Sequence, residues 1–181
     1  AHLNHAAEDF LTINMGATAI GTGICAEPGY AEKLGVTVCL ENMPMNYFSI
    51  ATPQQILAFV REINDDHIQI CLDTGHVAVF NRLSIGDEVR RLGDYIKVLH
   101  IHDNDGVGDL HQVPFTFTKT RENKPSTDWD GFIRGLKRIH FDKVLSFETA
   151  PVLNSFPEEM KQDTLGFIAK IGQYFAAKIG E

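Results

Sequence analysis

The feature that most constrains this chain is a regular alternation of short apolar runs and amphipathic helices from residue 35 onward. The first helix of the series begins at Thr52, because Thr52-Pro53-Gln54-Gln55 has the pattern of a capping box with proline in the first turn. Strands separated by single helices are typical of βαβ units and a parallel sheet. The runs are apolar on both faces, as a sheet covered by helices requires. The sequence therefore predicts an α/β protein with strands at residues 35–42, 67–76, 95–104 and 143–150.

The first 34 residues do not continue this alternation. We expect a helix near residues 3–13, one strand at Ala17–Ile24 and a short helix around residues 28–34. The chain is accordingly divided into an N-terminal segment of unassigned origin, residues 1–34, and a β/α portion, residues 35–181.

Composition narrows the class of protein. The chain has 181 residues, 44% of them hydrophobic, and a net charge of −8. It has no apolar run long enough to span a membrane, and its first residues lack the pattern of a secretory signal. The acidic balance argues against a nucleic-acid partner. Its three cysteines (Cys25, Cys39 and Cys71) form no CxxC pair, and Cys39 and Cys71 are interpreted as small core residues. We therefore expect a cytoplasmic protein with no disulfide framework.

Residues capable of metal binding or acid–base chemistry follow each predicted strand. Glu41, Asp73, His100 and Glu148 come at or near the ends of successive apolar runs. The carboxyl ends of parallel strands form one rim, where the active sites of such folds lie. A single carboxylate there is more often a helix cap or a solvated loop residue, but four matching positions favour a site. Two Glu, one Asp and one His suit one divalent ion such as Mn, Mg, Co or Zn.

Two further pairs leave alternatives open. His100 and His102 lie two apart on a strand and face the same side, so either can be the ligand. The other would support that ligand or contact substrate, and we assign His102 to substrate. Asp109 and His111, in the polar loop after this strand, are a second ligand-like pair or simply solvated.

Four stretches resemble the xylose-isomerase-like TIM-barrel superfamily: VTVCLEN, ICLDTGH, VLHIHDNDGVGDLHQVP and STDWDGFIRGLKRIHFDKVLSFE. The resemblance extends from about residue 34 to residue 181. The group includes sugar phosphate isomerases and epimerases and the tri-zinc apurinic endonucleases. It implies that the four predicted strands are the last four of a barrel. Since an eight-stranded barrel typically needs about 250 residues, we expect a partial, C-terminal half barrel.

The resemblance also implies roles for the strand-end residues. Glu41, Asp73, His100 and Glu148 match the metal ligands, and Glu41 and Glu148 match the catalytic acid and base. His76 matches a substrate contact in the sugar enzymes. In the endonucleases, the counterparts of His76, Asp109 and His111 hold an additional metal ion. 

The function implied is a metal-dependent isomerase or epimerase of carbohydrate metabolism, which acts on a sugar or sugar phosphate by proton transfer through an enediolate. One alternative is a phosphodiesterase of the apurinic endonuclease type, although the N-terminal histidine ligands of that group have no assignable counterpart. Another is a catalytically incomplete barrel fragment, whose open sheet edges would favour a homo-oligomer.

Residues 11–33, LTINMGATAIGTGICAEPGYAEK, resemble a segment of the aspartase/fumarase superfamily. The mobile serine loop and the long helical bundle of that group have no counterpart here. This second resemblance therefore implies no lyase chemistry.

Overall fold

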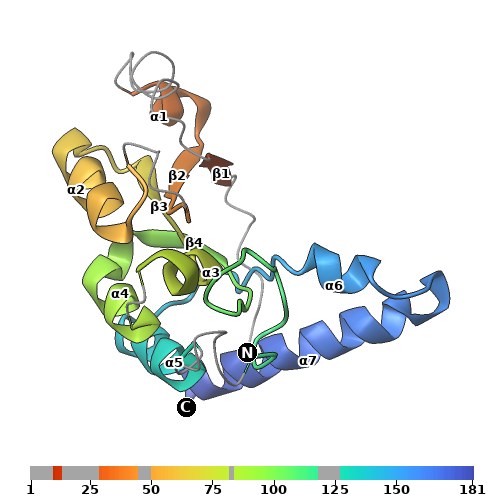
Figure 1. Ribbon diagram of the computed structural model, residues 1–181. Coiled ribbons are helices and arrows are strands. Elements are labelled where there is room, and N and C mark those ends of the chain that lie inside the picture. The colour runs from red at the N-terminus through yellow and green to blue at the C-terminus, as the bar shows by residue number, and fades with distance from the viewer. Residues whose placement is uncertain (1–9, 14–28, 45–49, 82–83, 118–126) are drawn as a thin grey trace.

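The fold is built on a parallel, open sheet (Figure 1). The computed structural model describes residues 10–13, 29–44, 50–81, 84–117 and 127–181. Its four strands follow one another in the order of the sequence and all pair in parallel. They are β1 (Phe10–Ile13), β2 (Thr37–Glu41), β3 (Ile68–Asp73) and β4 (Ile96–His100). Within the described residues no pairing closes the sheet on itself, so the predicted parallel α/β architecture is confirmed in its open, partial form.

Helices follow the strands as the alternation predicts. The α-helices are α1 (Tyr30–Leu34), α2 (Pro53–Ile63), α3 (Thr74–His76), α4 (Ile85–Leu92), α5 (Trp129–Arg138), α6 (Ala150–Asn154) and α7 (Lys161–Gly180). Shorter turns of other types are η2 (Val77–Asn81), η3 (Gly93–Tyr95) and η4 (Glu158–Met160). Figure 1 shows α2, α4 and α5 following one another along one side of the sheet, with the end of α7 beside α5. None of the described helices combines the length and apolarity needed to cross a bilayer.

The start of α2 illustrates how local sequence determines an element. The Thr52 hydroxyl accepts a hydrogen bond from the Gln55 backbone N–H at 3.2 Å, and the Gln55 side-chain oxygen accepts one from the Thr52 backbone N–H at 3.0 Å. The predicted capping box is therefore confirmed. Behind it, Ile56 and Val60 are buried one turn apart and attach the helix to the core.

Close backbone contact between α4 and α5 is permitted by glycine. A Cβ atom at Gly86 would lie 2.4 Å from the carbonyl oxygen of Gly131. One turn later, a Cβ at Gly135 would lie 3.1 Å from the carbonyl oxygen of Gly86. The close approach brings α5 against the core, where the side chains of Phe132 and Phe175 are fully buried.

Sequence predictions differ from the structure at several places. The strand expected at residues 67–76 ends at Asp73, because Thr74–His76 forms α3. The helix expected near residues 3–13 is wrong at its end, because Phe10–Ile13 forms β1 and pairs with β2. The strand expected at residues 143–150 is reduced to one parallel bridge between Ile101 and Phe147. The short helix expected around residues 28–34 is confirmed by α1. The strand expected at Ala17–Ile24 lies outside the described residues.

Candidate metal centre and active site

Four predicted side chains converge at the carboxyl ends of the strands. Glu41, Asp73 and His100 are the last residues of β2, β3 and β4, and Glu148 follows the bridge to Ile101. His100 Nδ1 lies 3.0 Å from Glu41 Oε1, 3.3 Å from Glu148 Oε2 and 4.0 Å from Asp73 Oδ2. One potential ligand atom from each of the four residues lies within 4.8 Å of the others. We name these four residues the rim cluster.

Burial gives the rim cluster its electrostatic character. Glu41 and Asp73 are buried, whereas the Glu148 side chain is 44% exposed, so the cluster opens to solvent on the Glu148 side. Burial lowers the pKa of His100, but the hydrogen bond to Glu41 and the charges of Glu41, Glu148 and Asp73 outweigh it and raise this pKa. Three carboxylates around one imidazole are suited to a divalent cation with mixed oxygen and nitrogen ligands.

Neighbouring polar groups fix the ends of the strands. The side-chain amide of Asn42 donates to the Asp73 carbonyl at 3.0 Å, and its oxygen accepts from the Asp73 backbone N–H at 2.8 Å. Thr74 connects β3 to the chain beyond β4, because its hydroxyl accepts from the His102 backbone N–H at 3.1 Å and donates to the His102 carbonyl at 2.9 Å. No role for Asn42 or Thr74 was predicted from sequence, although each directly follows a predicted ligand, Glu41 or Asp73.

A second cluster lies beside the first and consists of His76, Asp109 and His111. Asp109 Oδ2 is 3.2 Å from Nε2 of His76 and 3.2 Å from Nε2 of His111. On the other side of each ring, His76 Nδ1 faces the Asn42 carbonyl at 2.8 Å and His111 Nδ1 faces the Glu148 carbonyl at 3.0 Å. We name these three residues the loop cluster.

The backbone carbonyls determine what the two rings can do. A carbonyl oxygen only accepts, so the Nδ1 atoms of His76 and His111 carry hydrogen. Both Nε2 atoms then face the same carboxylate oxygen. Metal-ligating histidines have this arrangement, in which the second ring nitrogen is fixed by a hydrogen bond to a carbonyl or carboxylate.

Protonation of His76 stabilises its contact with Asp109. Burial lowers the pKa of His76, but the hydrogen bond to Asp109 and the charges of Asp73 and Asp109 raise it to about 9. Burial raises the pKa of Asp109, yet the hydrogen bond and charge of His76 hold it well below its usual range. The contact between His76 Nε2 and Asp109 Oδ2 is therefore that of an imidazolium with a carboxylate.

His102 lies between the two clusters and is completely buried. Its Nε2 is 3.0 Å from Asp73 Oδ2, and its ring stacks on that of His111 with 4.1 Å between centroids. The structure therefore brings all of the predicted site residues to one end of the sheet. 

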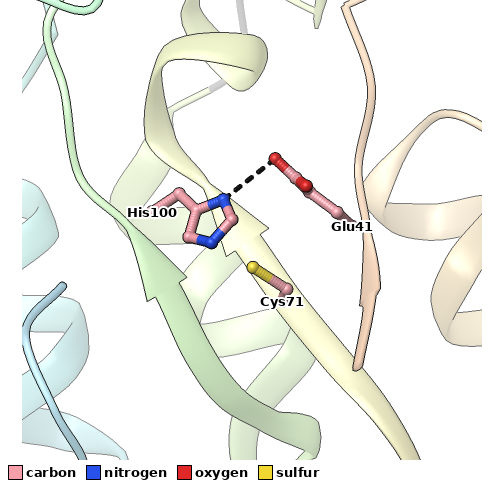
Figure 2. Close-up of side chains that lie close together, drawn as sticks. All are labelled: Glu41, Cys71 and His100. Carbon is pink, nitrogen blue, oxygen red and sulfur yellow. Dashed lines mark hydrogen bonds and ion pairs between the residues drawn. The ribbon is translucent and has the colours of Figure 1, made fainter. Parts of the chain in front are cut away.

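Cys71 contributes to the wall of the site. It lies two residues before Asp73 on β3, and its side chain lies near Glu41 and His100 (Figure 2). One ligand atom from each of the three residues lies within 4.8 Å of the others. The burial predicted for Cys71 is confirmed, whereas its place beside Glu41 and His100 was not predicted from sequence.

Comparison with known proteins shows which family has this architecture. The family model described as "xylose isomerase-like TIM barrel" matches residues 24–171. The chain belongs to this family. The resemblance noted over residues 34–181 is thus confirmed, and the open sheet corresponds to part of the family's barrel.

Members of the xylose isomerase-like family with described activities are among the matches. The D-psicose 3-epimerase of Ruminiclostridium cellulolyticum is 38% identical over 72 residues, which cover 39% of this chain and 24% of that protein. The D-allulose 3-epimerase of Methylomonas sp., solved in complex with D-allulose, is 25% identical with a TM-score of 0.50, covering 66% of this chain and 37% of that one.

A D-tagatose 3-epimerase-like protein shares the fold, with a TM-score of 0.61 and 20% identity over 92% of this chain and 64% of that one. The chain therefore spans between about a quarter and two thirds of the length of these relatives. It is related to sugar epimerases at the level of the superfamily.

Proposed function

We propose that this chain carries the metal and acid–base centre of a divalent-metal-dependent epimerase or isomerase of sugars or sugar phosphates. The observation that carries the proposal is the convergence of two Glu, one Asp and one His in the rim cluster. The relatives named as D-psicose and D-allulose 3-epimerases support a ketose as the class of substrate. Glu41, Asp73, His100 and Glu148 would hold one Mn, Mg, Co or Zn ion.

The ion would polarise the carbonyl group of the substrate as a Lewis acid. The chain's own task is proton transfer at the carbon next to that carbonyl. Glu41 Oε1 and Glu148 Oε2 both lie close to the His100 ring, at 3.0 Å and 3.3 Å from its Nδ1. One carboxylate would remove the proton and the other would return one, so that the configuration at this carbon inverts.

The surroundings of the two glutamates differ in a way that suits two roles. Glu41 is buried and hydrogen-bonded to His100, whereas Glu148 is the most exposed member of the rim cluster. Substrate would therefore approach from the Glu148 side. His76, which is held by the Asn42 carbonyl, would orient substrate hydroxyl groups.

Solvent-proton exchange tests this mechanism. The chain is loaded with Mn²⁺ or Co²⁺ and incubated with a panel of ketohexoses in D₂O, and the substrate's α-proton is followed by NMR. Glu41→Gln and Glu148→Gln should each abolish exchange, because an amide does not accept the proton. Glu159→Gln, on the exposed turn before α7, is the matched control and should exchange as the wild type does. Exchange at wild-type rates in both site variants would refute the two-glutamate mechanism.

The loop cluster supports a second candidate, a metal-dependent phosphodiesterase of the apurinic endonuclease type. His76, Asp109 and His111 offer two imidazoles and a carboxylate to an additional ion. The net charge of −8 argues against a DNA substrate. Native mass spectrometry with Zn²⁺ separates the candidates: one ion per chain favours the epimerase, and additional ions together with cleavage of abasic DNA favour the phosphodiesterase.

A further inference from the structure

We propose that α7 is a dimerisation surface, on which a second copy of this chain packs with its own α7 running in the opposite direction. The helix is the longest of the described elements, with 20 residues from Lys161 to Gly180. Figure 1 shows its first half projecting beyond α5, with α6 beside it. The proposal uses no residue of the rim cluster or the loop cluster, so it does not rest on the proposed function.

Burial distinguishes two faces of α7. The inner face consists of residues that recur every three or four positions: Thr164, Ile168, Ile171 and Phe175. Phe167 and Tyr174 lie seven residues apart on another face and are 55% and 44% exposed. The ring of Phe115, which is also exposed, lies 6.1 Å from that of Tyr174 and extends the aromatic surface. Exposed aromatic side chains gathered on one face are typical of a protein contact.

This exposed face is self-complementary when two copies of the helix run antiparallel. With a two-fold axis midway between residues 170 and 171, Phe167 of each copy lies opposite Tyr174 of the other. The same axis places Asp163 opposite Lys178, and both of these residues are exposed. The two Lys170 side chains lie near the axis, where their long stems can cover the aromatic pairs while the ammonium groups reach solvent. Aromatic thus meets aromatic, and acid meets base, at both ends of the helix pair.

A basic groove of about 860 Å³ lies where α4, α5 and α7 end. Its wall includes two apolar and four cationic side chains: Phe141, Ile179, Arg90, Arg134, Lys137 and Arg138. Glu181 is the acidic residue of the wall, and it already binds Lys178 at 2.8 Å. Among the described residues, no acidic side chain forms an ion pair with Lys137 or Arg138. The groove therefore offers unpaired positive charge beside apolar surface.

The turn before α7 carries the opposite charge. Glu158 and Glu159 lie in η4, and two exposed apolar residues, Phe156 and Met160, flank them. We name these four residues the acidic tip. Because α7 spans about 30 Å, the acidic tip and the basic groove lie at opposite ends of the helix. Antiparallel pairing therefore brings the acidic tip of each copy to the basic groove of the other.

The size of the contact shows why both features are needed. One face of α7 covers a strip about 30 Å long and about 10 Å wide, roughly 300 Å². A stable interface covers about 800 Å² on each partner. The two-fold axis repeats the contact between acidic tip and basic groove at both ends of the helix pair, so two such contacts add to the strip. An isologous contact of this kind closes at two copies.

Association measured in two near-matched variants tests the surface. Phe167→Lys places a charge in the exposed face, whereas Leu165→Lys changes a similarly exposed residue (52%) on the other side of the helix. That side faces the sheet, because a Cβ atom at Gly172, seven residues after Leu165, would lie 3.2 Å from the ring of Phe147. In sedimentation experiments the wild type should be a dimer. Phe167→Lys should raise its Kd at least about tenfold, and Leu165→Lys should change it by less than about twofold.

Two outcomes of this experiment would overturn the proposal. One is a wild-type chain that stays monomeric at all concentrations. The other is an assembly that Leu165→Lys weakens as much as Phe167→Lys does, or that neither change weakens, because such an assembly would form through the open edge of the sheet.

Exchanging charges tests the contact between acidic tip and basic groove. Glu158→Lys with Glu159→Lys should weaken the dimer about tenfold or more, and so should Lys137→Glu with Arg138→Glu. All four changes together should restore the wild-type Kd to within a few-fold, because opposite charges meet again. If the fourfold variant associates as weakly as the two double variants, this contact is refuted.

Disulfide cross-linking tests the direction of the helices. In a mixture of Asp163→Cys and Lys178→Cys chains, antiparallel pairing places the two new cysteines opposite each other, so a cross-linked mixed dimer should form on mild oxidation. Each variant alone should not cross-link through its new cysteine, because the two copies of one position lie about 22 Å apart along the axis, too far for a disulfide. Cross-linking of Asp163→Cys alone, with none in the mixture, would indicate parallel helices and overturn the proposal.

Discussion

The protonated state of His76 should make the stability of the metal-free chain depend on pH in the neutral to alkaline range. The ring lies between the Asn42 carbonyl and the Asp109 carboxylate and is 5% exposed, so it is held as an imidazolium. Replacing it with Gln removes the titrating group and keeps a polar side chain of similar length. The expected effect is a difference between wild type and His76→Gln in how the free energy of unfolding depends on pH.

The magnitude follows from the gap between the folded and unfolded pKa values. The pKa of His76 is about 9 in the folded chain and 6.5 when unperturbed. At about 1.4 kcal/mol per pH unit, this gap corresponds to about 3 kcal/mol. Because the folded pKa is the higher one, the contribution is fully present below pH 6.5 and is lost as pH rises through 9. For a chain of this size, about 3 kcal/mol corresponds to a change in Tm of roughly 6–12 °C.

The assay is urea unfolding in EDTA at intervals from pH 6 to pH 9.5. The raised pKa of His100 contributes a slope of the same sign, so the quantity to compare is wild type minus His76→Gln. That difference in the free energy of unfolding should fall by up to about 1.4 kcal/mol per pH unit across the window. A difference that stays constant from pH 6 to pH 9.5 would refute this account of the loop cluster.

Four further outcomes can be measured directly. Asp109→Asn should leave the Zn²⁺ count at one ion per chain in native mass spectrometry, because the proposed epimerase ion is held by the rim cluster. A count that falls by one would place an ion between His76 and His111 and favour the phosphodiesterase. Thr52→Ala should lower the free energy of unfolding by about 1 kcal/mol in urea titration, because the cap of α2 is lost. The control Thr116→Ala, on an exposed turn, should change the free energy of unfolding by less than about 0.5 kcal/mol. Gly86→Ala should cost about 1–3 kcal/mol because its methyl group meets the Gly131 carbonyl, and a neutral result would contradict the close helix contact. The open sheet predicts self-association, so light scattering should give a mass above that of one chain, and a monomer at all concentrations would refute it.

The parts of this fold that sequence could predict are those determined by local chemistry or by strand topology. Thr52 and Gln55 cap α2 through their own hydrogen bonds, so four letters suffice to place its start. Glu41, Asp73 and His100 meet because parallel strands deliver their last residues to one edge. No contact between distant side chains had to be known for either prediction.

The parts that sequence could not predict depend on pairing across the chain. Phe10–Ile13 has three apolar residues and one threonine and fits a helix or a strand, and its pairing with β2 decides the outcome. Residues 143–150 are predicted to form a strand from sequence. Among the described residues, two backbone hydrogen bonds join them to Ile101: Ile101 N–H to Ser146 O (2.8 Å) and Glu148 N–H to Ile101 O (3.2 Å). A single bridge suffices to place Glu148 at the rim cluster but not to form a regular strand.

The arrangement of the strands has different consequences for metal binding and for selection of a particular sugar. All four members of the rim cluster come from β2, β3, β4 and the segment bridged to Ile101, which are neighbours in the sheet. Three of them end strands whose registers are fixed by backbone pairing, and Asn42 joins the two carboxylate-bearing strands through both of its polar atoms. The convergence of the proposed ligands therefore needs no closed barrel, whereas a pocket that encloses a sugar needs walls on every side of Glu148. This arrangement predicts that the chain binds a divalent ion tightly but discriminates poorly among ketoses. Measuring Mn²⁺ affinity and comparing proton-exchange rates across a panel of ketohexoses would test this prediction.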